Sequence, residues 1–342
     1  MISMLRRWIA GLKNDENPSD SFTTRPRQTS SAPDTHSVTA NDKAERQVED
    51  RELALRYCAT LFFRTDPCRQ GRLTNQERDW LEDWQKRMAN DNGSFSGSVP
   101  RLPVVMPKLM AALRDAEQVD LKHVAGLIES DPVLAANVLR VVNSAAIRGR
   151  AGDIDSLTHA VTRLGRNGLR EVVFAAIVSP LADFGRDRRL NDEAVRRIWP
   201  QTLQAAVNVK MGAEHSGMSA QRFDLYLAAL SHSTGLMVML RELKRLEFTE
   251  LSSEFLNEFE RLARYASINV ARGWDFGEQT LTLLTAWADG DLGRPEVSLL
   301  SRVIEFGRVH HLCQQGHLEP DFRDTYCRAL PVAANEWVSS VD

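Results

Sequence analysis

The stretch IESDPVLAANVLRVVNSA, residues 128–145, decides the fold class of this chain. Asp131 is a favourable helix N-cap, and Pro132 behind it suits the first helical turn. Aliphatic residues then recur at helical spacing, so we expect them to face inward from one side of the helix. They are Leu134, Val138 and Val141. Asn143 follows the helix, and its side chain is expected to satisfy free backbone groups at the helix end.

The same periodicity runs through the chain from residue 101 to residue 342. Asp120 is expected to cap a helix over residues 121–130. Further stretches with the apolar spacing of helices follow at 156–166, 168–180, 190–215, 221–241, 250–272, 276–289 and 295–315. Glycines such as Gly165 mark the turns between them. Because sustained alternation with period 2 is missing from this sequence, it predicts an all-α bundle of many helices.

The composition is that of an ordinary globular protein, with 342 residues, 26% charged and 43% hydrophobic residues and a formal net charge of -3. This balance excludes a surface built as a whole for nucleic acid or membrane. The four cysteines form no CxxC pair, so we expect a reducing, intracellular setting. No window approaches the roughly 18 uninterrupted apolar residues of a spanning helix, so we expect neither a transmembrane nor a secreted protein.

Residues 1–13, MISMLRRWIAGLK, form a basic amphipathic pattern. On a helical wheel the apolar residues share one face and the basic residues lie opposite. The apolar face includes Ile2, Leu5, Trp8, Ile9 and Leu12, and the basic residues include Arg6 and Arg7. Such a helix makes a weak contact with an anionic membrane, or it docks on a protein surface. Both interpretations stay open.

Residues 14–42 are rich in Ser, Thr, Pro, Asn and Asp, and they are predicted to form a disordered tether. Residues 43–90 regain apolar residues at helical spacing and are predicted to form a small helical segment. Thr74 and Glu77 within it have the spacing of a capping box. Residues 91–100 are predicted to form a second linker, which leaves residues 101–342 as the main domain.

Three pieces of the main domain resemble the opening half of the HDOD family, bacterial signal-output domains related to HD phosphohydrolases. They are LPVVMPKL (102–109), the stretch 128–145 and AVTRLGRNGLREVV (160–173). Weaker similarity continues through IWPQTL (198–203), LAALSHSTG (227–235) and ARGWDFG (271–277). The motif positions that we expect to be structural are Asp131, Pro132, Arg140, Asn143, Ser144, Leu164, Gly165 and Arg170. The resemblance implies an HD-like helical bundle with an N-terminal helical extension and a disordered tether.

The resemblance also implies where a catalytic centre would lie. An HD phosphohydrolase holds a divalent metal with a helix His, a His-Asp pair and a later Asp, because the ion activates water and neutralises phosphate charge. In this sequence those positions fall at Gln201, at His232 and Ser233, and near Gly307 or Arg308. One imidazole cannot hold a catalytic metal against water. We therefore expect no catalytic residue, no metal and no cofactor.

Two interpretations of the remaining group stay open. His232 is either a core histidine bonded to a helix, or it forms a vestigial ligand pocket with Gln201 and Ser233. A separate set at helical spacing, His310, Cys313 and His317, matches zinc ligands but lacks a CxxC or HxxxH pair. Arginines outnumber acids over residues 140–200, whereas residues 242–260 are acidic and are expected to form an exposed helix face.

The expected function is that of a non-catalytic bacterial signal-transduction module that acts through protein-protein interaction. The resemblance implies partners such as response regulators, kinases or diguanylate cyclase and phosphodiesterase proteins, in two-component or cyclic-di-GMP regulation. The alternative is a sensor of a nucleotide or small metabolite, and a divergent phosphohydrolase is a third reading. Nucleic acid is not expected as a partner. The expected location is the cytoplasm, with peripheral contact at the inner membrane through residues 1–13.

Overall fold

The computed structural model describes residues 52–62, 68–69, 71–90, 104–113, 120–148, 152–184, 190–243, 248, 250–319 and 321–323. All of them belong to one compact unit that spans Val48–Asp342. The predicted amphipathic helix (1–13), tether (14–42) and linker (91–100) lie outside the described residues, so they stay predictions.

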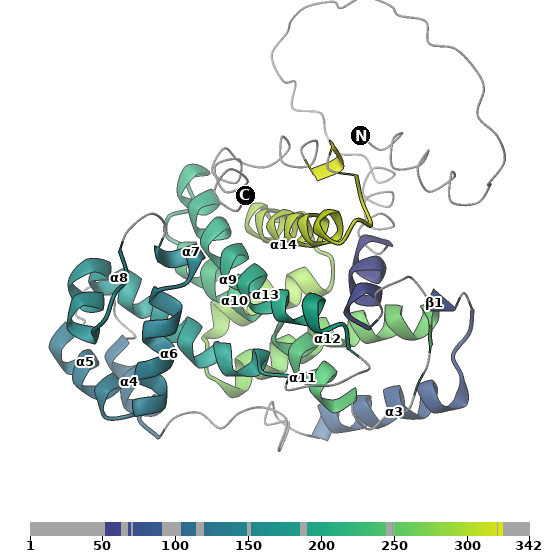
Figure 1. Ribbon diagram of the computed structural model, residues 1–342, viewed down its shortest axis with the longest axis horizontal. Helices are drawn as coiled ribbons and strands as arrows, with labels where there is room; N and C mark the ends of the chain where they lie inside the picture. The colour runs from purple at the N-terminus through teal and green to yellow at the C-terminus, as the bar shows by residue number, and fades with distance from the viewer. Residues whose placement is uncertain are drawn as a thin grey trace, which may run out of the picture. The chain divides into compact units, whose positions relative to one another are not determined.

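The described residues form helices almost throughout (Figure 1), which confirms the predicted all-α class. After a helix over residues 52–62 come α3 (Asn75–Asn90), α4 (Met106–Leu113), α5 (Leu121–Glu129), α6 (Pro132–Val142), α7 (Ala145–Arg148) and α8 (Leu157–Val178). A 3-10 turn, η1 (Ser179–Ala182), leads to α9 (Asp192–His215), α10 (Arg222–Ser231), α11 (Thr234–Glu242), α12 (Ser253–Gly273), α13 (Glu278–Ala288) and α14 (Pro295–Gln314). The only described strands, β1 (Cys68–Arg69) and β2 (Leu251–Ser252), pair in parallel.

Helices α4–α8, which we call the motif helices, contain the stretch that decided the fold class. Asp131 caps α6 by accepting hydrogen bonds from the amides of Val133 and Leu134, both at 3.0 Å. Asn143 ends the helix. Its amide donates to the carbonyls of Leu139 (3.0 Å) and Ile154 (2.7 Å), and its carbonyl oxygen accepts from the Ile154 amide at 2.8 Å. The side chain therefore joins the end of α6 to the loop before α8.

The inward face of α6 is as predicted, because Leu134, Val138 and Val141 are all buried. Gly165 differs from its prediction. It marks no turn between two helices but lies inside α8, where its φ of 62° and ψ of -168° kink the helix. Only glycine adopts this backbone conformation at little cost, so one residue bends α8 without ending it.

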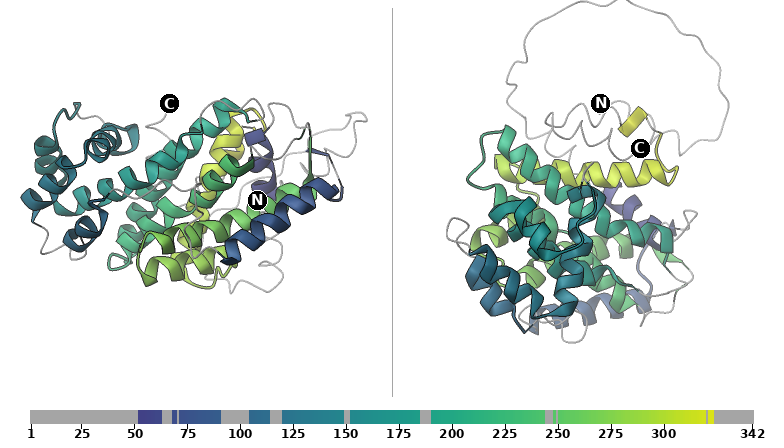
Figure 2. Two further views of the ribbon diagram at one scale, coloured as in Figure 1. Left: turned by 90° about the horizontal axis from the view of Figure 1, so that it is seen from below. Right: turned by 60° about the vertical axis from the view of Figure 1, so that its left-hand side comes forward.

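The remaining helices pack against one another in a continuous bundle. Helix α9 lies against α10 and α14, α11 against α12, and α12 against α13 and α3. Figure 2 shows the motif helices gathered at one side of these elements. This arrangement brings α9, α12 and α14 together, although they are far apart in the sequence.

The segment before the main domain packs into the same hydrophobic core. Tyr57, Leu61 and Trp84 are buried there with residues of the later helices. Thr74 and Glu77 form the predicted capping box, with bonds of 2.6 and 3.2 Å. Glu77 also accepts hydrogen bonds from the backbone (2.7 Å) and hydroxyl (3.0 Å) of Ser252. The described part of residues 43–90 thus shares one hydrophobic core with the helices of the main domain.

One described stretch, Arg222–Glu242, has the length and composition of a membrane-crossing helix. In the structure it is divided between α10 and α11, and 83% of its apolar window is buried inside the fold. The apolar residues of this stretch therefore form part of the hydrophobic core.

Candidate functional site

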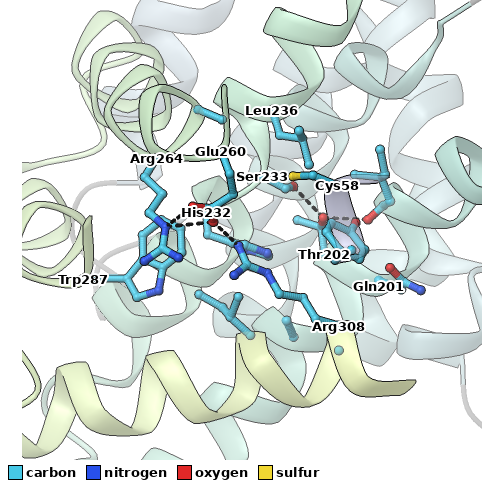
Figure 3. A pocket seen from close by; sticks show the side chains of 16 residues that line it. Cys58, Gln201, Thr202, His232, Ser233, Leu236, Glu260, Arg264, Trp287 and Arg308 are labelled. Atoms are coloured by element: carbon cyan, nitrogen blue, oxygen red, sulfur yellow. Dashed lines mark hydrogen bonds and ion pairs between the residues drawn. The ribbon is translucent and has the colours of Figure 1, made fainter. Parts of the chain in front are cut away.

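A small pocket lies among residues 52–62 and helices α9–α14 (Figure 3), and we call these elements the pocket helices. Gln201, His232 and Ser233 all line it, so the structure brings the three predicted residues of the vestigial site together. Its volume is about 40 Å³. A water needs about 10–15 Å³ by this measure, so the pocket holds about three waters.

Gln201 is fixed by a chain of hydrogen bonds that leads out of the pocket. Its amide nitrogen lies 3.1 Å from Nδ1 of His311, and Nε2 of His311 lies 2.9 Å from the Thr60 hydroxyl. Because the Thr60 hydroxyl donates to the Tyr57 carbonyl at 2.7 Å, Nε2 of His311 carries the proton and Nδ1 accepts from Gln201. Burial, first, and the Arg197 charge lower the pKa of His311 to about 3. His311 is therefore a neutral, buried link.

Ser233 is buried and fixed in the same way. Its hydroxyl lies 2.6 Å from that of Thr202, which itself donates to the Ile198 carbonyl at 2.7 Å. The hydrogen between the two hydroxyls therefore comes from Ser233. At the position of a metal-binding aspartate in HD enzymes, this chain has an uncharged donor that already has a partner.

His232 is bonded to a helix and also lines the pocket. Nδ1 donates to the Ala229 carbonyl of α10 at 2.5 Å, and the ring also lines the pocket, edge-on to Trp287 with centroids 6.0 Å apart. Burial lowers the pKa of His232 to about 4, and the charges of Arg308 and Arg264 lower it further against the opposing effect of the Ala229 bond. The imidazole is neutral at pH 7, with Nε2 left as an acceptor.

A close approach of two helices positions His232 and Ser233. The amide of Gly235, at the start of α11, donates to the Ser267 hydroxyl of α12 at 2.9 Å. The single hydroxyl hydrogen of Ser267 is shared between the carbonyl oxygens of His232 (2.8 Å from Oγ) and Ala263 (3.0 Å from Oγ). A β-carbon at residue 235 would lie 2.1 Å from the Ala263 carbonyl oxygen, so only glycine permits this contact.

The pocket is also lined by a buried cluster of three charges, formed by Glu260, Arg264 and Arg308. Glu260 accepts hydrogen bonds from Nε of Arg264 (2.8 and 3.0 Å) and from a terminal nitrogen of Arg308 (2.7 Å). Burial acts to raise the pKa of Glu260, but the two guanidinium groups hold it below its ordinary value. The expectation of an exposed acidic face over 242–260 is wrong at both ends, since Glu242 and Glu260 are buried. Each is paired with an arginine of another helix.

The donor set of this pocket does not fit a divalent metal. Of the positions implied by HD enzymes, Gln201 and Ser233 already have partners, and Arg308 brings a positive charge to the pocket. The guanidinium groups of Arg264 and Arg308 would repel a cation. Among the described residues, no group of three or more His, Cys, Asp or Glu side chains is placed to hold a metal ion.

The same holds for the zinc set suggested by His310, Cys313 and His317. Helix α14 ends at Gln314, and Gly316 with a φ of 75° turns the chain, so His317 does not continue the helical spacing. His310 is buried and stacks on Phe306, with centroids 6.2 Å apart. The structure thus does not bring the three side chains together as ligands.

The family-motif residues lie away from the pocket and support the motif helices. The Ser144 hydroxyl donates to the Val141 carbonyl at 2.6 Å, and Leu164 packs half-buried against the core. Arg140 is exposed and donates to Asn137 at 2.8 Å. The guanidinium of Arg170 lies 3.5 Å from the ring centroid of Phe223, which joins α8 to α10.

Among the pocket residues that sequence reasoning missed as members of a site are Tyr57, Cys58, Glu260 and Arg264. The spacing of Glu260 and Arg264, i and i+4, is a helix ion-pair signal that could have been recognised. Tyr57 and Cys58 gave no such signal, because the fold alone brings residues 52–62 to α12 and α14. Burial raises the pKa of the Cys58 thiol to about 12, so it carries no charge in the pocket.

Comparison with known proteins places the fold and then the family. A crystal structure named "Putative metal-dependent phosphohydrolase", from Shewanella amazonensis SB2B, has a TM-score of 0.53 and 19% identity, and the alignment covers 79% of this chain and 100% of that one. A crystal structure of an HDOD domain protein with unknown function from Geobacter sulfurreducens has a TM-score of 0.48 and 21% identity, over 71% of this chain and 80% of that one. The first of these shows that the chain has an HD-like helical fold.

The HDOD domain model matches residues 99–288, more than half of the chain. The chain belongs to the HDOD domain family. An uncharacterized protein of Treponema pallidum (strain Nichols) is 25% identical over 158 residues, which make up 46% of this chain and 29% of that protein. This chain therefore spans less than a third of that relative's length.

Proposed function

We propose that this HDOD protein is a non-catalytic signal-transduction module that acts through protein-protein interaction. Its partners are expected among response regulators, kinases and diguanylate cyclase or phosphodiesterase proteins, in two-component or cyclic-di-GMP regulation. The observation that supports the absence of catalysis is Arg308, whose guanidinium lines the pocket where an HD enzyme needs a cation. Repulsion between this charge and a divalent ion opposes metal-assisted hydrolysis.

A hydrolysis assay tests this proposal. The full chain is incubated with Mn²⁺ and with cyclic dinucleotides or nucleoside phosphates, and phosphate release is measured. We expect no release above the rate of a His232→Ala control. Release that depends on Mn²⁺ and disappears in His232→Ala would establish the divergent phosphohydrolase instead.

The interaction role needs a separate measurement. The full chain is used as bait, because residues 52–62 form part of the core and a truncation at residue 101 would remove them. We expect a stoichiometric complex with a signalling protein that survives purification and reforms from the isolated components. A chain that remains alone at micromolar concentration beside each class of partner contradicts the role.

We further propose a cytoplasmic location with weak contact to anionic membrane through residues 1–13. The full chain is expected to sediment with anionic vesicles, and deletion of residues 1–13 or Trp8→Ala is expected to weaken sedimentation. Equal sedimentation of the full and shortened chains would remove this contact.

The second candidate function is that of a ligand sensor. The observation in its favour is that Gln201, His232 and Ser233 line one pocket that also contains charged side chains. At about 40 Å³ the pocket accommodates a small metabolite or one group of a larger molecule, rather than a whole nucleotide, in this conformation. Thermal-shift screening tests it, because a ligand that binds only the folded state raises the unfolding temperature. The shift should be lost in His232→Ala.

A further inference from the structure

The charges that line the pocket do not cancel. Two guanidinium groups, of Arg264 and Arg308, face one carboxylate, of Glu260, and the three side chains are only 18%, 11% and 12% exposed. The other titratable groups of the lining are His232, Tyr57 and Cys58, and burial keeps all three neutral at pH 7. The pocket therefore has one uncompensated positive charge. Such a charge is costly to bury without a counter-ion.

The arginines also keep donors that Glu260 does not use. Arg264 bonds Glu260 through Nε, and Arg308 does so through one terminal nitrogen. Within the described part of the chain, the other guanidinium N–H groups of these two residues make no hydrogen bond, although Arg264 lies over Trp287 and Arg308 over Tyr57. Guanidinium forks of this kind match the oxygen atoms of phosphate and carboxylate groups.

The size of the pocket selects among anions. Space for about three waters suits one phosphate-sized group and excludes a nucleotide base with its sugar. His232 adds a ring nitrogen, Nε2. In the neutral ring it accepts a hydrogen bond from a protonated phosphate oxygen, and in the protonated ring it donates a hydrogen bond to the anion. The Trp287 and Tyr57 rings close the sides and lower the local polarity, which strengthens charge-assisted hydrogen bonds.

We propose that this pocket binds a small oxyanion of about the size of phosphate, held by Arg264 and Arg308 with His232 as a third contact. The inference rests on the second proposed function, ligand sensing, and it names the class of ligand. In Figure 3 the labelled Arg264 and His232 lie toward one end of the pocket and Gln201 lies at the other, and we place the anion beside the first two and Arg308.

The test is an NMR titration of the full chain labelled in its histidine rings. Inorganic phosphate is added at pH 7 with chloride adjusted to constant ionic strength. We expect the His232 ring signals to shift with saturation and the His232 pKa to rise, because a bound anion favours the imidazolium form. The exposed His215 is the internal reference and should show no saturable shift.

Three variants separate binding from folding. Arg264→Lys and Arg308→Lys keep the charge beside Glu260 but lose the planar fork, so each should weaken phosphate binding at least tenfold while the chain stays folded by circular dichroism. Arg261→Gln changes an arginine of the same helix that pairs with Glu258 outside the pocket, and it should bind phosphate like the unchanged chain. Binding equal in all four proteins would overturn the proposal.

Further titrations distinguish a wrong assignment of the oxyanion site from a failure of the proposed ligand-sensing function. Acetate in place of phosphate tests whether a carboxylate suffices, and saturation by either anion supports an oxyanion site. If a nucleoside monophosphate saturates His232 and neither anion does, the small-oxyanion site is wrong while ligand sensing stands. If phosphate binds but leaves complex formation with a purified partner unchanged, the site stands and sensing through that partner fails.

Discussion

The motif helices and the pocket helices hold their polar side chains in different ways. Among the described residues, side-chain hydrogen bonds within the motif helices join groups no more than 15 residues apart, as for Arg163 and the Arg148 carbonyl. In the pocket helices the decisive bonds are long-range, with a sequence separation of 48 for Glu260 and Arg308 and of 251 for Thr60 and His311. The bonds inside the first region are local, although Glu171 of α8 also bonds Lys210 of α9 at 2.9 Å, whereas the second region depends on a network that exists only in the finished fold.

This difference determines how each region should respond to mutation. A local cap stabilises one helix end. Its loss should lower the free energy of unfolding by about 1 kcal/mol, the contribution of that cap alone, and leave other contacts in place. In a network of buried polar groups, the loss of one member leaves its partners without bonds. The following substitutions test that contrast, from the largest expected effect to the smallest.

Gly235→Ala should destabilise the protein by more than about 3 kcal/mol, because its β-carbon would lie 2.1 Å from the Ala263 carbonyl oxygen and force α11 from α12. Urea unfolding measures the change. The control is Gly126→Ala in α5, where a β-carbon meets nothing within 4 Å. That change should stabilise by about 0.5–1 kcal/mol through helix propensity. Equal effects at the two glycines would contradict the close contact.

Glu260→Gln should cost about 3 kcal/mol at pH 7, because it leaves Arg264 and Arg308 buried without a counter-charge. The pKa of Glu260 is lowered in the folded state, so its contribution is present above its unfolded pKa and is lost as pH falls through the folded pKa. The difference between the two proteins should therefore shrink in acid below about pH 4.5.

The matched control for Glu260→Gln is Glu258→Gln, which removes a pair with 43% and 36% exposed side chains. It should cost less than about 1 kcal/mol and show little dependence on pH. Urea unfolding from pH 7 to pH 3 measures both variants. If the loss of unfolding free energy in Glu260→Gln stayed constant over this pH range, the charge of Glu260 would not contribute to stability.

Asn143→Ala should cost about 2 kcal/mol, since the buried loop end at Ile154 loses partners for both its amide and its carbonyl. Arg140→Ala, on the exposed side of the same helix, should change stability by less than about 0.5 kcal/mol. Thermal unfolding distinguishes them. A similar loss for the two variants would remove the structural role assigned to Asn143.

Thr60→Val should have the smallest effect, about 1 kcal/mol, because the Nε2 proton of His311 loses its acceptor. Thr282→Val is the control, because its exposed hydroxyl bonds only the Glu278 carbonyl of its own helix. It should be close to neutral. Chemical denaturation compares the two, and an equal loss would show that the long-range bond contributes nothing.

The sequence predicts the motif helices well because their signals are local. Asp131 with Pro132 and the apolar spacing after them specify where a helix begins and which face it buries. Gly165 was predicted as a turn because sequence spacing does not distinguish a break from a kink. The predicted members of the pocket came from family positions, but Tyr57 and Cys58 could not be found, since nothing in residues 52–62 specifies a partner so distant in the chain.

The bond between Thr60 and His311 also bears on how the protein is made. Residues 52–62 leave the ribosome early, whereas α14, which carries His311 and Arg308, leaves it near the end of synthesis. The helix over residues 52–62 cannot pack against α14 until the intervening chain has been synthesised, because its bond to His311 closes a loop of 251 residues. Until then its apolar side is exposed. A chain stopped before residue 295 would have the complete family match and still lack the completed pocket.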